Sequence, residues 1–174
     1  MYFGYTGAAG ELSNPVTENL TSNRYWVHPS IITGAQTQPG GESDQRLLDK
    51  TEPAGPRTFN NLTGTHKPVM YNDPSTLAAD PGADIPFMTN EELLLLRAEV
   101  RWNTGDKPGA ISDIDVVRQS AGGLAATTLT AGSSDDAFIT ELLYNRLYSL
   151  DAGHALDRCP TVRQCRRPAA RSLG

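Results

Sequence analysis

The chain has 174 residues, of which 38% are hydrophobic, and a formal net charge of -5. This length fits one ordinary domain or a piece of a larger one, and the hydrophobic fraction predicts a modest core. The negative charge argues against nucleic acid as the main partner, because a protein that binds phosphates needs a basic face. The sequence also lacks the run of about 18 apolar residues that a membrane-spanning helix requires.

The first part of the chain, residues 1–84, is rich in Gly, Pro, Asn, Asp, Ser and Thr, and its apolar runs are short. This composition predicts loops with a few short strands. The beginning of the chain lacks the basic and apolar regions of a secretory signal peptide. Residues 72–84 contain several possible oxygen ligands, but their spacing differs from that of an EF-hand calcium loop.

A first helix is predicted to begin at Thr89, because Glu92 follows three residues later at the spacing of a capping box. Gly105 can take the left-handed conformation that ends a helix, and Asp106 can cap the next one. The apolar spacing predicts one buried face. The residues expected on that face are Leu93, Leu96 and Val100, widened by Leu94, Ala98 and Trp102.

A second helix is expected to end at Gly122 and Gly123, and a third to begin at Ser133 or Ser134. The short turn between the first two makes them antiparallel, so that they share their apolar faces. The residues expected to be buried in the second and third helices are Ala110, Ile114, Val117, Phe138, Leu142, Leu143, Leu147 and Leu150. Ile111, Val116, Tyr144 and Tyr148 are expected beside them.

The predicted fold is therefore mostly α, with a helical hairpin plus a third helix, preceded by a loop-rich segment with few short strands. A helix pair of roughly 34 residues has the size of a tetratricopeptide unit, so the hairpin is expected to be tetratricopeptide-like. We expect three regions: the loop-rich segment 1–84, the helical region 85–150 and an irregular tail, 151–174.

An ordered series of short motifs runs through the helical region. A leucine-rich helix carries Arg-Ala-Glu and is followed by Gly-Asp, by an alanine-containing helix with a Val-Arg pair, by a glycine turn, and by a helix with Glu-Leu and an arginine. The residues of the series are Arg97, Ala98, Glu99, Gly105, Asp106, Ala110, Val117, Arg118, Gly122, Gly123, Glu141, Leu142 and Arg146. Upstream, Asp44 stands shortly before Arg46. The series resembles the C-terminal portion of the SusD/RagB family of outer-membrane nutrient-binding lipoproteins.

The resemblance implies a noncatalytic protein that captures a glycan or another nutrient on the external face of the outer membrane. Its implied partner is a TonB-dependent, SusC-like transporter, and its implied contact with the membrane is a lipid anchor. Because family members are several times longer, we expect this chain to be a C-terminal fragment of a larger SusD-like domain.

The tail departs from the family pattern. Where the family continues with Gly-His-Arg-Trp, this chain has Gly153 and His154 followed by a stretch rich in arginine and proline. We hypothesise that residues 151–174 are a frameshifted or chimeric end. Cys159 and Cys165 lie in this tail, and we expect them to be incidental thiols because no second pair of metal ligands accompanies them.

Five neighbouring residues are the predicted ligand contacts: Asn23, Arg24, Tyr25, Trp26 and His28. Aromatic rings can cover the apolar faces of a sugar while planar polar side chains fix its hydroxyls. The alternative is that Trp26 packs the loop-rich segment onto the helices. Trp102 is expected in the core.

Catalysis and cofactors are not expected. The pairs Arg97 with Glu99 and Asp113 with Asp115 stand two residues apart, and such residues do not face each other on a helix. Salt bridges to a neighbouring helix, or solvation, fit these residues better than acid-base chemistry does. The alternative function is a free-standing helical-hairpin adaptor that binds another protein through its groove. A hydrolase remnant is a weaker third hypothesis.

Overall fold

A computed structural model describes residues 2–4, 10, 12–13, 26–59, 61–70, 80–83 and 85–150. Its helices are α2 (Pro29–Thr33), α3 (Gln45–Lys50), α4 (Asn90–Asn103), α5 (Lys107–Ser120) and α6 (Asp135–Leu150). Its strands are β1 (Tyr2–Phe3), β2 (Thr51–Phe59), β3 (Leu62–Pro68) and β4 (Ile85–Pro86). A mostly helical fold with few short strands is thus confirmed for the described part of the chain.

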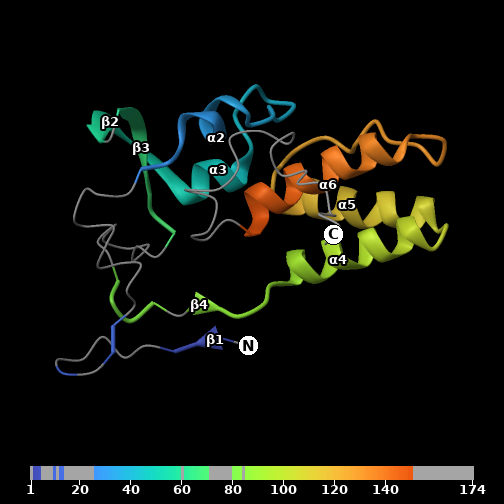
Figure 1. Ribbon diagram of the computed structural model, residues 1–174, viewed down its shortest axis with the longest axis horizontal. Coiled ribbons are helices and arrows are strands. Elements are labelled where there is room, and N and C mark those ends of the chain that lie inside the picture. The colour runs from blue at the N-terminus through green and yellow to red at the C-terminus, as the bar shows by residue number, and fades with distance from the viewer. Residues whose placement is uncertain are drawn as a thin grey trace, which may run out of the picture.

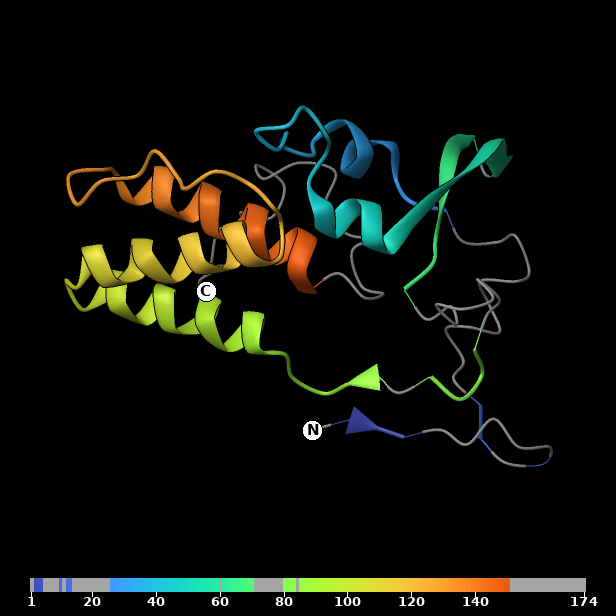
Figure 2. The ribbon, with the colours of Figure 1, turned by 180° about the vertical axis from the view of Figure 1, so that it is seen from behind.

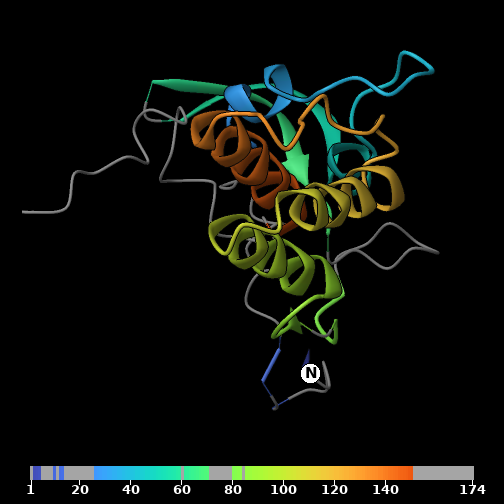
Figure 3. The ribbon, with the colours of Figure 1, turned by 90° about the vertical axis from the view of Figure 1, so that its right-hand side faces the viewer.

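Helices α4, α5 and α6 pack together as a small bundle, which Figure 3 shows nearly end-on. The predicted boundaries are confirmed by the caps. The Thr89 hydroxyl accepts a hydrogen bond from the Glu92 backbone N–H at 3.2 Å, and the Asp106 side chain caps α5. Gly105 adopts a left-handed φ of 94°, and the Ser134 hydroxyl accepts from the Ala137 N–H at the start of α6. Local chemistry therefore fixes where each of these helices begins.

Ala98 and Trp102 are buried as expected, but the rest of the buried face of α4 differs from the predicted one. Leu95, Ala98 and Trp102 face the core, whereas Leu93, Leu96 and Val100 are 50%, 42% and 61% exposed. Both sets recur at helical spacing, since the run of leucines gives α4 two apolar faces. The choice between them comes from packing: Trp102 stacks on Phe138 of α6 with ring centroids 4.1 Å apart, which turns this face inward.

The core of α5 matches the prediction better than that of α6 does. Ala110, Ile114, Val117, Phe138 and Leu142 are buried as expected. In the C-terminal half of α6, however, the buried residues include the polar side chains of Asn145, Tyr148 and Ser149, while Leu143, Leu147 and Leu150 are only half-buried. Asn145 and Ser149 are buried because this side of α6 faces Arg46 of α3, to which both side chains are hydrogen-bonded.

Two short helices occur in the segment for which loops and strands were expected. His28 caps α2 by accepting a hydrogen bond from the Ser30 N–H at 3.2 Å, and Asp44 caps α3. Both helices lie beside the C-terminal half of α6 (Figures 1 and 2). The second hydrophobic cluster of the described residues forms there from Val27, Ile31, Leu47 and Tyr148.

The strands form two small antiparallel pairs. β2 and β3 make a hairpin that continues directly from α3, and β1 pairs with β4 just before α4 (Figure 1). A two-stranded hairpin is marginally stable by itself, so the hairpin depends on its contacts with neighbouring elements. One such contact is the Val27 N–H, which donates to the His66 carbonyl of β3 at 3.0 Å.

The two apolar faces of α4 can be distinguished by substitution. Leu95→Ala should lower the free energy of unfolding by about 2–5 kcal/mol, because it opens a cavity at a fully buried site. The matched variant Leu96→Ala should change it by less than about 1 kcal/mol, since surface substitutions are usually close to neutral. Urea unfolding followed by circular dichroism measures both values. Equal losses, or a larger loss for Leu96→Ala, would show that the outer face is the core face.

Candidate functional site

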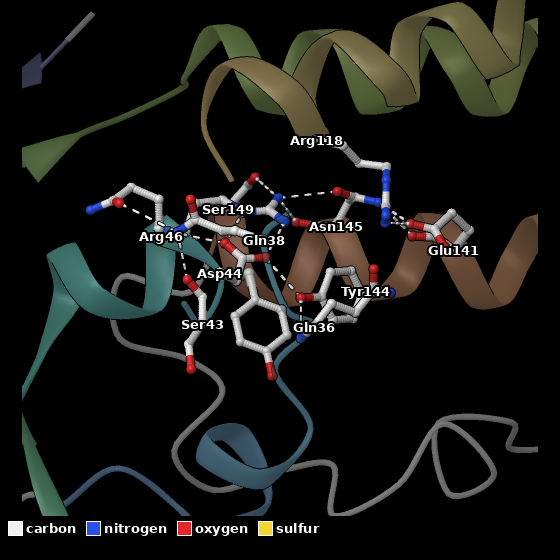
Figure 4. A network of polar contacts seen from close by, with 12 residues as sticks. Gln36, Gln38, Ser43, Asp44, Arg46, Arg118, Glu141, Tyr144, Asn145 and Ser149 are labelled. Carbon is white, nitrogen blue, oxygen red and sulfur yellow. Dashed lines mark hydrogen bonds and ion pairs between the residues drawn. The ribbon is translucent and has the colours of Figure 1, made fainter. Parts of the chain in front are cut away.

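A buried ion pair between Asp44 and Arg46 lies where α3 meets α6 (Figure 4). Asp44 Oδ1 accepts from the backbone N–H of Arg46 at 3.0 Å and from its Nε at 2.9 Å. Nη2 of Arg46 donates to Asp44 Oδ2 at 2.6 Å. The two side chains are 0% and 3% exposed, so the pair is removed from water. A buried ion pair stabilises a fold only when further hydrogen bonds offset its desolvation.

Helix α6 supplies those further hydrogen bonds. Nη1 of Arg46 donates to Asn145 Oδ1 at 3.1 Å and to Ser149 Oγ at 2.9 Å. The Tyr144 hydroxyl donates to Asp44 Oδ2 at 2.8 Å. Among the described residues, no buried side-chain nitrogen or oxygen lacks a hydrogen-bond partner. The network therefore joins α3 to α6 without leaving a reactive group unsatisfied.

Gly122 closes the network from the side of α5. Its carbonyl accepts a hydrogen bond from the Gln45 N–H at 2.9 Å. A Cβ at this position would lie 3.1 Å from Nη2 of Arg46 and 2.8 Å from the Arg118 carbonyl oxygen. The sequence predicted only that Gly122 ends a helix. The structure shows that Gly122 also packs closely against the buried guanidinium of Arg46.

The tyrosines of α6 belong to the same network. The Tyr144 hydroxyl accepts from the Gln36 N–H at 2.9 Å, and the Tyr148 hydroxyl donates to the Ile31 carbonyl at 2.7 Å. Burial raises the pKa of Tyr148 to about 12, and the charge of Asp44 acts in the same direction. Burial likewise raises the pKa of Tyr144. Both hydroxyls therefore stay protonated at neutral pH and can serve as donors.

The charged motif residues of α4 and α5 form an interhelical cluster. Arg97 donates to the Asp113 carboxylate through Nε at 2.9 Å and Nη2 at 2.7 Å. Arg101 donates to the same carboxylate at 2.9 Å. Asp115 instead accepts from the Thr127 backbone N–H at 2.6 Å. Asp113 and Asp115 thus have separate structural partners.

The remaining motif charges link α6 to the other two helices. Arg146 donates to the Glu99 carboxylate of α4 at 2.7 Å. Arg118 of α5 pairs with Glu141 of α6, and its Nε donates to the Ala125 carbonyl at 3.0 Å. Each pair of helices in the bundle is consequently joined by at least one ion pair between motif residues or their neighbours.

A small cavity lies beside the buried ion pair, between α2, α3, the end of β3 and α6. Its volume is about 40 Å³, which suits water-sized molecules and is far below the roughly 300 Å³ of a small-molecule site. Its lining is mostly apolar and consists of Val27, Ile31, Arg46, Leu47, Lys50, Thr51, Pro68, Met70, Leu147 and Tyr148. This cavity is too small for a sugar ring.

Two of the five predicted ligand contacts fall within the described residues. Trp26 is half-buried and packs over Gly64 of β3, where an added Cβ would lie 2.9 Å from the Trp26 Cβ. Trp26 therefore contacts the β2–β3 hairpin. His28 is occupied as the cap of α2, with its Nδ1 2.7 Å from the Ser30 hydroxyl. Asn23, Arg24 and Tyr25 lie outside the described residues.

The sequence did not nominate the α6 side of the buried network. Glu141, Asn145 and Ser149 recur every four residues and form a polar stripe along α6. That stripe is a signal that could have identified the contact with a buried charge, because buried polar residues on a helix face need partners. Because leucines stand between these polar residues, the sequence predicted a leucine-lined buried face instead.

Other predictions concern residues that are not described. The tail 151–174, with its two cysteines, lies outside the described residues, as does most of 72–84. Among the residues that the structure does describe, no group of three or more His, Cys, Asp or Glu side chains is arranged to hold a metal ion. None of the helices described is both long and apolar enough to cross a bilayer.

Comparisons with protein families, with curated proteins and with solved structures found no match to this chain.

Removal of one partner of the buried ion pair should destabilise the fold far more than removal of one partner of a surface pair. Arg46→Leu should lower the free energy of unfolding by about 3–5 kcal/mol, because it leaves the Asp44 carboxylate buried without its partner. The matched control is Lys67→Leu, which breaks the surface ion pair between Lys67 and Glu52. The side chains of these two residues are 39% and 37% exposed. The control should lose less than about 1 kcal/mol. Urea unfolding that gave equal losses would contradict a central role for Arg46.

Stability should fall at alkaline pH in a way that depends on the buried tyrosines. The unfolded chain releases tyrosine protons near pH 10, whereas the folded chain holds the Tyr148 proton up to about pH 12. The contribution of Tyr148 is therefore fully present below about pH 10 and is lost as pH rises through about 12. The urea concentration at the midpoint of unfolding should fall less steeply with pH across this range for Tyr148→Phe than for the unchanged chain. An unchanged slope in the variant would contradict the raised pKa.

Proposed function

We propose that this chain belongs to a noncatalytic nutrient-binding protein of the SusD/RagB type. Such a protein captures a glycan or another nutrient at the external face of the outer membrane and delivers it to a TonB-dependent, SusC-like transporter. The ordered motif series in residues 97–146 and the upstream Asp44 and Arg46 carry the resemblance. A lipid anchor on the full-length protein would provide its contact with the membrane.

The observation that best supports this proposal is that the charged motif residues form ion pairs between helices. Arg97, Glu99, Arg118, Glu141 and Arg146 all pair between helices, and they do not converge on a described cavity. A motif that serves catalysis would instead place a nucleophile, acid or base at a shared reaction site. A motif whose charges hold helices together is what a rigid binding scaffold needs.

The hairpin geometry agrees with a tetratricopeptide-like unit. Helices α4 and α5 each have 14 residues, and three residues join them. Units of this kind expose loops at their ends and present extended surfaces to partners. In the proposed protein, the helices would carry the transporter contact and the loop-rich segment would carry the ligand.

The alternative is a helical-hairpin adaptor that binds another protein and no glycan. The specific observation in its favour is the exposure of Leu93, Leu96 and Val100 on the outer face of α4, since exposed apolar patches often mark protein contacts. The two functions differ in whether a polysaccharide binds and whether Trp26 matters.

Affinity electrophoresis in gels containing soluble polysaccharides tests the proposal. We expect one of amylopectin, xylan or a mixed-linkage β-glucan to retard the chain. Trp26→Ala should weaken this binding by about two- to tenfold, because ring stacking contributes about 0.5–1.5 kcal/mol. Phe87→Ala, which removes a 57% exposed ring outside the predicted contacts, is the matched control and should leave binding unchanged.

Thermal unfolding of the same variants separates the two roles of Trp26. A lower melting temperature with unchanged polysaccharide binding would assign Trp26 to packing on the β2–β3 hairpin alone. Absence of retardation by all three polysaccharides would favour the adaptor.

A further inference from the structure

Helix α4 has two apolar faces, and the described residues cover only one of them. Leu95, Ala98 and Trp102 pack in the bundle, while Leu93, Leu96 and Val100 form a stripe on the opposite side of the helix. We call these three exposed residues the outer stripe. α4 is also the bundle helix that lies farthest from α2 and α3 (Figures 1 and 2). A helix that is apolar on both sides is typical of one that packs on both sides.

Charges of opposite sign border the outer stripe. Leu93, Leu96 and Val100 stand at i, i+3 and i+7, which are the seam positions of a coiled coil. Arg97 comes directly after Leu96 in the sequence and lies on one flank of the seam. Glu92 and Glu99 come directly before Leu93 and Val100 and lie on the other flank. Arg97 is 54% exposed and Glu99 45% exposed even in their pairs within the bundle.

The hydrogen bonds that Arg97 makes to Asp113 leave further N–H donors that could bind a second carboxylate. Its two hydrogen bonds to Asp113 use Nε and Nη2, and a guanidinium has two further N–H donors on Nη1. A partner helix that fits this surface needs an apolar seam, an acidic residue facing Arg97 and a basic residue facing Glu92 and Glu99.

We propose that the outer stripe is a self-association surface, on which α4 of a second copy of this chain packs in parallel. In that arrangement a two-fold axis runs along the helices, so the basic flank of each copy meets the acidic flank of the other. Arg97 of one copy then faces Glu92 of its partner, which is the favourable pairing of flanking residues in a parallel two-stranded seam. An antiparallel pair would bring like flanks together, which disfavours it. This inference is independent of the proposed nutrient binding.

Sedimentation equilibrium over about a hundredfold range of concentration tests the association. We expect a reversible dimer of the unchanged chain, and Leu96→Gln should raise its dissociation constant at least about tenfold, since each copy loses a buried leucine. Leu48→Gln is the matched control, because Leu48 of α3 is similarly exposed at 46% but lies away from the stripe. The control should leave the dissociation constant unchanged. Far-UV circular dichroism of each variant shows that the helices remain folded.

The orientation is tested by reversing one flanking charge. Glu92→Lys should weaken a parallel dimer, because the new charge faces Arg97 of the partner, and the weakening should shrink as salt screens the charges. Glu91→Lys makes the same change in the same helical turn but away from the stripe, so it controls for loss of the favourable interaction with the helix dipole.

Three results would overturn the proposal. A chain that stays monomeric throughout the concentration range has no self-association surface. A dimer that Leu96→Gln and Leu48→Gln weaken equally uses another surface. A dimer that Glu92→Lys strengthens has its α4 helices antiparallel.

Discussion

The contact between the loop-rich segment and the bundle depends on the buried guanidinium of Arg46. Its hydrogen bonds to Asn145 and Ser149 hold α3 against the end of α6, together with those that Lys50 of α3 donates to the Tyr148 and Ser149 carbonyls. Asp44 has two tasks in this arrangement, since it caps α3 and neutralises the arginine. Because the pair is buried, its geometry must be satisfied completely, and this requirement gives the contact its specificity.

Charges and apolar side chains have different tasks in the bundle. Stacking of Trp102 on Phe138 and burial of the aliphatic residues around them supply most of the driving force, which is not directional. The ion pairs between helices fix which faces meet, because a carboxylate and a guanidinium bind well in few orientations. The charged residues of the motif series are therefore engaged in contacts between helices.

The outer stripe of α4 gives the molecule an apolar surface that its own described residues do not cover. Its flanking charges differ in sign from one side to the other, so the surface distinguishes parallel from antiparallel partners. Among the three bundle helices, α4 lies farthest from α2 and α3 (Figures 1 and 2).

The sequence by itself determined the ends of the helices and the hairpin between α4 and α5, since caps and turn glycines such as Thr89 and Gly105 act through neighbouring backbone atoms. Spacing also showed that Asp113 and Asp115 cannot work together on one helix face. Tertiary structure alone decided that Leu95 joins Ala98 and Trp102 on the buried face of α4 while Leu93, Leu96 and Val100 stay exposed, because the partner surface on α6 makes that choice. It also decided that Arg46 meets a residue 99 positions away, a contact that no local pattern encodes.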